Sequence, residues 1–184
     1  VKANFPKGVL YLNTNLTGSY NAENIMAAAC IANFFDVDPL KIQKALIEYH
    51  PSNNRSQLIQ SGNLKIIMDA YNANPTSMQA SIKSFLSGFP DKEYTAVILG
   101  DMLELGKYAI REHTEMLYEL QKHPVNRVYL VGPLFSEASK GFPFKTFANV
   151  ELLCSELKKN PLKQGAVLIK GSRGIQLEKT LEYL

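Results

Sequence analysis

The segment that begins at Asp69 has side chains suited to binding a ligand, and it follows directly on the apolar run 64–68. A carboxylate at the end of a buried strand stands where open α/β sheets bind ligands. Asp69 could accept two hydrogen bonds from a ribose diol, and nothing nearby in the sequence offers it a salt bridge. Tyr71 could stack on a base or cover the sheet edge, and the sequence leaves both roles open. Asn74 precedes a proline, so we expect it to cap a helix.

Two further segments bring polar side chains to the ends of predicted strands. Asp101 and Glu104 could form a carboxylate pair for a metal ion or an ammonium group, or could cap the loop before the next helix. Lys170, Ser172 and Arg173 lie in a glycine-containing turn whose amides and positive charges suit a phosphate or a carboxylate. Taken alone, that turn favours a solvated surface loop. The convergence of all three segments at strand ends favours a ligand site.

Several kinds of site have no motif in this chain. A Gly-x-x-x-x-Gly-Lys-Ser/Thr loop does not occur, so the chain has no conventional means of holding ATP phosphates and Mg²⁺ by itself. Cys30 and Cys154 lie among apolar residues, and there is no CxxC pair or His/Cys cluster. We therefore expect reduced, buried thiols and no zinc site. His113 is expected on a helix surface rather than in a site.

Composition is typical of an ordinary globular protein. Of the 184 residues, 46% are hydrophobic and 20% are charged, which suits one sizeable domain with an appendage. The formal net charge of +3, without a stripe of Lys or Arg, argues against a nucleic-acid partner. No apolar run approaches the length of a membrane span and no signal peptide opens the chain, so we expect a cytoplasmic protein without membrane association. The chain lacks a starting Met, which suggests a piece of a longer protein.

The pattern of predicted helices and strands differs before and after residues 50–54. These residues, His-Pro-Ser-Asn-Asn, are a cluster of helix and strand breakers. We therefore expect a domain boundary between residues 1–51 and 52–184. Before it, the sequence predicts a strand at 8–12, an alanine-rich helix at 21–35 and a second helix after Asp38.

After the boundary, apolar runs and helical patterns alternate along the chain. The runs predict a hairpin and then further strands, at 56–60, 64–69, 94–100, 127–131, 144–147 and 166–170. The helical patterns predict helices at 75–88, 110–122, 134–139, 149–159 and 174–183. This alternation is typical of an α/β fold with a doubly wound, mostly parallel sheet flanked by helices.

Four blocks of sequence resemble the Mur ligase family. Residues 18–29 begin Gly-Ser-Tyr-Asn-Ala-Glu-Asn and look like the end of the family's central ATPase domain. Residues 69–78 read Asp-Ala-Tyr-Asn-Ala-Asn-Pro-Thr-Ser-Met, residues 100–106 read Gly-Asp-Met-Leu-Glu-Leu-Gly, and residues 170–173 read Lys-Gly-Ser-Arg. The resemblance implies a Rossmann-like carboxy-terminal domain after the boundary, preceded by a mainly helical remnant of the ATPase domain.

The resemblance also implies roles for individual residues. The nucleotide-binding set would comprise Asn21 and Asn24 beside the adenine, Arg55 on the phosphates, Asp69 on the ribose, and Tyr71 and Asn72 in the adjoining loop. Asn54 stands where the family has a glycine before its arginine. Arg55 and Lys170 would be catalytic. The candidates on the substrate side are Asp101, Glu104, Ser172 and Arg173.

The activity that the resemblance implies is ATP-dependent amide formation in peptidoglycan precursor synthesis. The terminal carboxylate of UDP-N-acetylmuramoyl-tripeptide would be phosphorylated, and the amine of D-alanyl-D-alanine would attack the resulting acyl phosphate. ATP and Mg²⁺ are the implied cofactors, held mostly by an upstream domain that this chain lacks, so we expect the chain to be inactive alone. The alternative is a non-catalytic α/β nucleotide- or partner-binding module.

Two expectations concern the protein as a whole. We expect the full-length enzyme to be monomeric and the present chain to self-associate through residues 1–50, whose helix would expose a face meant for missing partners. In the full-length enzyme, we expect Asp69→Ala to weaken ATP use while leaving the fold intact.

Overall fold

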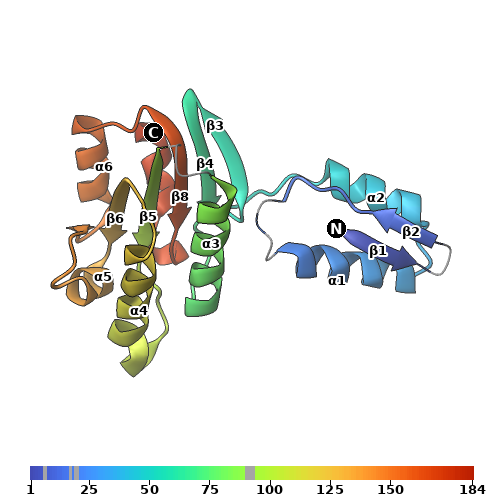
Figure 1. Ribbon diagram of the computed structural model, residues 1–184, viewed down its shortest axis with the longest axis horizontal. Helices are drawn as coiled ribbons and strands as arrows, with labels where there is room; N and C mark the ends of the chain where they lie inside the picture. The colour runs from blue at the N-terminus through green and yellow to red at the C-terminus, as the bar shows by residue number, and fades with distance from the viewer. Residues whose placement is uncertain (6–7, 17, 19–20, 90–93) are drawn as a thin grey trace. The chain divides into compact units, whose positions relative to one another are not determined.

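The computed structural model describes residues 1–5, 8–16, 18, 21–89 and 94–184. It divides into two compact units, unit 1 (Val1–Ser52) and unit 2 (Asn53–Leu184) (Figure 1). Within the described ranges, no helix combines the length and the apolar character needed to cross a lipid bilayer.

Unit 1 combines an antiparallel strand pair with two helices around a small apolar core. The elements are β1 (Lys2–Phe5), β2 (Gly8–Tyr11), α1 (Asn21–Phe34) and α2 (Pro39–Glu48). Asp38 caps α2, because its side chain accepts the Leu40 N–H. The predictions for β2 and for both helices agree with the structure. The sequence prediction omits β1, in which Ala3 is the one buried residue, so the strand has no apolar alternation to reveal it.

Unit 2 is built on a six-stranded sheet with the order β3-β4-β8-β5-β6-β7. β3 (Gln57–Ser61) and β4 (Asn63–Asp69) form an antiparallel hairpin at one edge, and the remaining pairings are parallel. The other strands are β5 (Thr95–Gly100), β6 (Arg127–Val131), β7 (Lys145–Phe147) and β8 (Gln164–Lys170). The predicted doubly wound, mostly parallel sheet is therefore confirmed.

Helices cover both faces of this sheet (Figure 1). One core cluster joins the sheet to α3 (Pro75–Gly88), α4 (Ala109–Gln121) and α5 (Pro133–Ala138). The other cluster joins it to α6 (Val150–Lys159) and the C-terminal segment. Ile66, Ile67 and Met68 of β4 alternate between the two clusters, as successive side chains of a strand do. All residues of β5 are buried, as in a strand covered on both faces.

The C-terminal segment consists of two 3₁₀ helices, η2 (Arg173–Ile175) and η3 (Leu177–Tyr183). Gln176 between them has a left-handed backbone with φ +59°, and its N–H donates to the Arg173 carbonyl. A regular α-helix does not continue through a left-handed residue. The prediction of a single helix at 174–183 is therefore wrong in helix type and in continuity.

The two cysteines differ in exposure. Cys154 on α6 is buried, but Cys30 on α1 is exposed, so the prediction of a buried thiol is wrong for Cys30. The buried residues of α1 are Asn21, Ile25 and Ala29, which follow one another at helical spacing. Cys30 comes one residue after this stripe and is therefore turned about 100° away from it.

Candidate functional site

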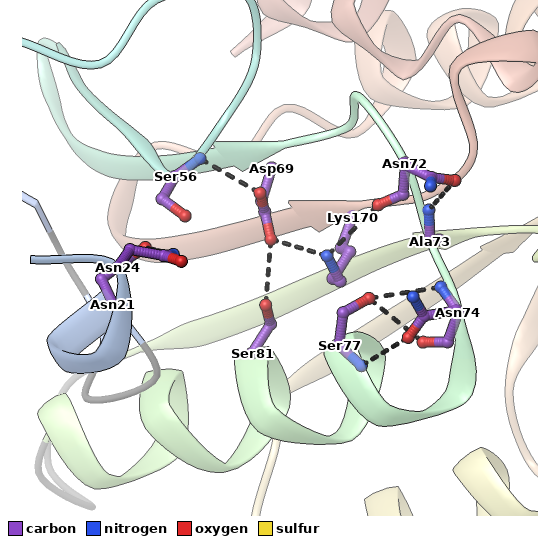
Figure 2. Close-up of polar contacts among 10 residues, drawn as sticks. All are labelled: Asn21, Asn24, Ser56, Asp69, Asn72, Ala73, Asn74, Ser77, Ser81 and Lys170. Atoms are coloured by element: carbon purple, nitrogen blue, oxygen red, sulfur yellow. Dashed lines mark hydrogen bonds and ion pairs between the residues drawn. The ribbon is translucent and has the colours of Figure 1, made fainter. Parts of the chain in front are cut away.

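The carboxyl ends of β4, β8 and β5 lie next to one another, because these strands are parallel neighbours in the sheet. Asp69 ends β4 and is the register partner of Lys170, which ends β8. The Lys170 Nζ lies 2.6 Å from the Asp69 Oδ2 (Figure 2). Their side chains are 3% and 14% exposed, respectively, so water has little access to this ion pair.

Asp69 also holds two neighbouring segments together. Its Oδ1 accepts the Ser56 N–H at 3.1 Å, and its Oδ2 accepts the Ser81 hydroxyl at 3.0 Å in addition to the Lys170 ammonium (Figure 2). A carboxylate offers about four acceptor positions, so about one remains open. A ribose diol would need two, and its second hydroxyl would have to displace an existing donor.

The segment that opens unit 2 has left-handed backbone at non-glycine residues. Asn53, Asn54 and Ser56 have φ angles of +59°, +58° and +47°. Asparagine tolerates this region better than most residues, because its short side chain can hydrogen-bond locally. Asn54 can therefore stand where the family has glycine. This backbone path leaves Arg55 exposed and directs the Ser56 N–H to Asp69.

Two guanidinium groups contact the ring of Tyr71. The Cζ of Arg55 lies 3.8 Å from the ring centroid, and the Cζ of Arg173 lies 5.4 Å from it. Both distances are within the range of cation–π interaction. Hydrogen bonding and charge from Arg55, followed by the charge of Arg173, lower the pKa of the Tyr71 phenol below its usual value. A base could stack on the ring face under Arg55 only by displacing the guanidinium.

Both asparagines of the Asp69 segment make local hydrogen bonds. The Asn72 Oδ1 accepts the Ala73 N–H at 2.8 Å, and the Asn72 carbonyl accepts from the Lys170 Nζ at 3.5 Å. The Asn74 Oδ1 accepts the Ser77 N–H at 2.8 Å, and the Ser77 hydroxyl accepts the Asn74 N–H (Figure 2). This capping box starts α3 and confirms the predicted role of Asn74.

Asp101 is fully buried and caps α5. Its carboxylate accepts the N–H groups of Leu134 at 2.9 Å and Phe135 at 2.8 Å, at the helix N-terminus. Gly132 makes room for it, because a Cβ there would lie 2.3 Å from the carboxylate carbon. Of the two roles that the sequence leaves open, capping is the one observed, at α5 instead of at the loop before α4. The sequence prediction gave Gly132 no role. Its place directly after the buried strand β6 could have indicated that it lies among the strand-end residues.

The remaining substrate-side candidates differ in exposure. Ser172 is buried, where its hydroxyl accepts the Leu103 N–H at 2.9 Å and its own N–H donates to the Asp101 carbonyl at 3.1 Å. It therefore connects the loop after β8 to the loop after β5. Glu104 and Arg173 are exposed. Among the described residues, no group of three or more His, Cys, Asp or Glu side chains could hold a metal ion.

His113 is buried, so the prediction of a helix-surface histidine is wrong. Its Nε2 accepts the Met102 N–H at 3.0 Å, which places the ring proton on Nδ1, 2.7 Å from the Ala109 carbonyl. Burial lowers the pKa of the imidazole, although the Asp101 Oδ1 lies 3.7 Å from Nε2. His113 thus fixes the loop after β5.

Asn21 and Asn24 lie in unit 1, in the first turn of α1. The Asn24 side-chain amide donates to the Asn21 Oδ1 at 3.0 Å. Asn21 is buried and Asn24 is exposed. Residues three apart lie on one side of a helix, so the spacing of the motif pairs the two amides. Ser19 and Tyr20 of the same block lie outside the described residues.

Known proteins resemble this chain in both sequence and structure. Residues 54–173 match the family described as Mur ligase, glutamate ligase domain. The UDP-N-acetylmuramoyl-tripeptide–D-alanyl-D-alanine ligase of Bacillus subtilis is 33% identical over 92% of this chain. The solved UDP-N-acetylmuramoylalanyl-D-glutamyl-2,6-diaminopimelate–D-alanyl-D-alanyl ligase of Acinetobacter baumannii has a TM-score of 0.85 and 27% identity over 98% of this chain.

These relatives are longer than this chain, which spans 38% of the Bacillus subtilis protein and 40% of the Acinetobacter baumannii chain. A MurF ligase of Thermotoga maritima, solved in complex with ADP, shares the fold with a TM-score of 0.78 at 22% identity, over 99% of this chain and 42% of its own. The family match extends over more than half of this chain, from residue 54 to residue 173. This chain therefore belongs to the Mur ligase family.

Proposed function

We propose that this chain is the carboxy-terminal portion of an ATP-dependent ligase that joins D-alanyl-D-alanine to UDP-N-acetylmuramoyl-tripeptide in peptidoglycan precursor synthesis. The names of the Bacillus subtilis and Acinetobacter baumannii relatives support this activity. The geometric observation that supports it most is the exposed guanidinium of Arg55, whose sequence neighbour Ser56 donates its N–H to Asp69 of the strand-end pair Asp69–Lys170. Positive groups at the carboxyl ends of parallel strands suit the phosphates of a nucleotide.

In the proposed reaction, the terminal carboxylate of the tripeptide takes a phosphoryl group from ATP and becomes an acyl phosphate, with release of ADP. The amine of D-alanyl-D-alanine then attacks the carbonyl carbon. A C–N bond forms, the C–O bond to phosphate breaks, and the amine loses one proton, which balances the release of inorganic phosphate as hydrogen phosphate. Phosphoryl transfer depends mainly on positioning and on neutralisation of charge. Arg55 supplies exposed positive charge for it, and Asp69 holds the Lys170 ammonium in a fixed place.

We assign several of the proposed nucleotide contacts to residues of this chain. Arg55 is assigned to the phosphates, Asp69 to one ribose hydroxyl through its open acceptor position, and the Asn21–Asn24 pair to the adenine. The Thermotoga maritima relative was solved with ADP, which supports nucleotide use. The described residues offer no cluster of three metal ligands, so we assign Mg²⁺ and most phosphate contacts to the longer protein outside this chain.

The surroundings of the proposed reaction follow from its substrates. We assign the reaction to the cytoplasm, because it consumes ATP. The proposed partners are the two small substrates, with no nucleic acid and no membrane. The full-length enzyme is proposed to act as a monomer.

The test uses the full-length protein that contains this chain. ADP release is measured with each substrate omitted in turn, and we expect it to require both UDP-N-acetylmuramoyl-tripeptide and D-alanyl-D-alanine. Arg55→Ala should lower kcat/KM about tenfold to hundredfold, because a hydrogen bond to a charged group contributes about 1.5–3 kcal/mol.

The matched control for this test is Arg111→Ala, since Arg111 is an exposed arginine of unit 2 paired with Glu112 at 3.2 Å. We expect this variant to keep wild-type turnover. ADP release that does not depend on D-alanyl-D-alanine would contradict the proposed reaction. Nucleotide binding without any turnover would favour the non-catalytic binding module.

A further inference from the structure

Side chains from three separate loops of unit 2 converge at one place on its surface. Arg55 comes from the segment that opens the unit, Tyr71 follows β4, and Arg173 begins η2 after β8. The two Cζ atoms lie 3.8 Å and 5.4 Å from the centroid of the same Tyr71 ring. Both arginines are exposed, and Tyr71 is half-buried. One aromatic ring thus holds two positive charges at the surface.

Among the described residues, neither guanidinium has an acidic partner. In the part of the chain that the structure describes, no carboxylate forms an ion pair with Arg55 or Arg173. The Asp69 carboxylate, two residues before Tyr71, is engaged by Lys170 at 2.6 Å. Two like charges on one ring repel each other, and the ring quadrupole offsets this repulsion only in part. An anion that contacts both guanidiniums would remove it.

Tyr108 in the same unit offers a comparison. Its ring also has two cations nearby, with the Lys107 Nζ at 5.2 Å and the Arg111 Cζ at 5.9 Å. Arg111, however, has a carboxylate partner in Glu112 at 3.2 Å, and it lies one helical turn from Lys107 in sequence. The cluster at Tyr71 differs because its cations come from separate loops and have no carboxylate partner among the described residues.

The charge of the cluster indicates which anion would fit. A carboxylate has a single negative charge and two oxygens, which one guanidinium can satisfy in bidentate fashion. A phosphoryl group has three terminal oxygens and nearly two negative charges, so it can engage two guanidinium forks at once. The pair Arg55–Arg173 therefore matches a phosphoryl group better than a carboxylate.

We propose that Arg55, Tyr71 and Arg173 form a single phosphoryl-binding site, in which Tyr71 positions both guanidiniums on the same group. The identity of the phosphoryl group rests on the proposed function. The group is either the terminal phosphate of the nucleotide or the acyl phosphate. It moves Arg173 from the substrate side, where the resemblance places it, to the phosphate side. Tyr71 is a positioning residue in this site, with no contact to a base.

The binding test uses the 184-residue chain and calorimetric titration with three probes. Tripolyphosphate represents the nucleotide, acetyl phosphate represents the acyl phosphate, and acetate represents a carboxylate. We expect Arg55→Ala and Arg173→Ala each to weaken binding of at least one phosphoryl probe about tenfold. The double variant should lose less than the product of the two single losses, because both arginines contact one group. Circular dichroism verifies that each variant is folded.

The probe that responds identifies the source of the phosphoryl group, tripolyphosphate for the nucleotide and acetyl phosphate for the acyl phosphate. Arg111→Ala is the matched control and should bind both probes as the wild type does. The proposal is overturned if Arg173→Ala binds both phosphoryl probes with wild-type affinity, or if the substitution weakens only the binding of acetate. It is also overturned if the wild-type chain binds neither phosphoryl probe.

The positioning role of Tyr71 has its own test. Tyr71→Phe keeps the ring that both cations contact but removes the hydroxyl that hydrogen-bonds Arg55, so it should retain part of the phosphoryl-probe affinity. Tyr71→Leu has similar bulk without an aromatic face, so it should lose affinity about as much as Arg173→Ala does. Equal affinities for the Phe and Leu variants would overturn the positioning role.

Kinetics of the full-length enzyme distinguish failure of this site from failure of the proposed function. We expect Arg173→Ala to raise KM for ATP or lower kcat, with KM for D-alanyl-D-alanine unchanged. A raised KM for D-alanyl-D-alanine alone would overturn the assignment while the ligase activity stands. The full-length protein could also lack ligase activity while its Arg173→Ala variant still loses probe binding. That result would support the site and contradict the proposed function.

Discussion

The buried ammonium of Lys170 requires compensation, because removing such an ion from water costs several kcal/mol. Asp69 supplies the compensating charge at 2.6 Å and also accepts hydrogen bonds from Ser56 and Ser81. The ion pair therefore connects the end of β8 to the opening segment of unit 2 and to α3. A substitution of either residue acts on the fold as well as on any bound nucleotide.

We expect Asp69→Ala to destabilise unit 2 by about 3–5 kcal/mol, because it leaves the Lys170 charge buried without its carboxylate partner. This replaces the expectation from the sequence that the fold stays intact. Urea unfolding followed by circular dichroism measures the loss, and Glu104→Ala serves as a control that removes an exposed carboxylate. The double variant Asp69→Ala, Lys170→Met should recover part of the stability. An unchanged unfolding midpoint for Asp69→Ala would show that the ion pair is structurally dispensable.

Individual residues were predictable where their role is local in sequence. Asn74 is a cap because its partner Ser77 is three residues away, and the sequence shows this directly. The pairing of Asp69 with Lys170 spans 101 residues and depends on the strand order, which the sequence does not display. His113 was misplaced although a signal existed, since it continues the apolar stripe of α4, whose other buried residues are Ala109, Met116, Leu117 and Leu120.

At the scale of elements, the contact between Asp101 and α5 shows how a loop residue fixes a helix. The carboxylate after β5 accepts two N–H groups of α5, and Gly132 leaves the space that the carboxylate occupies. Gly132 has φ +118°, so a side chain at this position would be strained as well as crowded. The start of α5 therefore depends on a glycine that is distant from Asp101 in sequence.

We expect Gly132→Ala to destabilise unit 2 by at least about 2 kcal/mol more than Gly141→Ala, because the displaced carboxylate would lose two hydrogen bonds while buried. Gly141 is a matched control, since it has φ +91° but a Cβ added there would meet nothing within 4 Å. Both variants place an alanine at positive φ, but Gly132, with φ +118° and ψ 162°, lies in a region essentially restricted to glycine, so backbone strain of about 1–3 kcal/mol contributes to the expected difference. Urea unfolding midpoints measure the difference. Equal losses of stability in the two variants would show that displacing the Asp101 carboxylate costs nothing.

Most elements of unit 2 were predictable because their apolar patterns reflect burial. β5 is buried throughout and reads as a continuous apolar run, and α3 begins at an unmistakable Asn-Pro start. The C-terminal segment was mistaken for one α-helix, because the left-handed backbone of Gln176 has no signature in residue type. β1 was missed for the opposite reason, since a short strand with a single buried residue has no pattern to detect.

At the scale of the whole molecule, the two units differ in how completely they bury apolar side chains. Unit 2 has a core cluster on each face of its sheet, whereas unit 1 has one small cluster. Large apolar side chains of unit 1 remain exposed, among them Tyr11, Ile31, Phe34, Phe35 and Leu40. Exposed apolar surface of this extent marks places where proteins bind partners or other copies of themselves.

We expect the 184-residue chain to self-associate through unit 1. Phe34 and Phe35 are 79% and 72% exposed, and burying one such side chain contributes about 1.5–3 kcal/mol. Sedimentation velocity over a range of concentrations measures the association. The double variant Phe34→Ser, Phe35→Ser should sediment as a single chain, whereas Leu152→Ser, which removes a 51% exposed leucine from α6 of unit 2, should associate like the wild type. A wild-type chain that stays single at every concentration would contradict this prediction, as would equal dissociation by both variants.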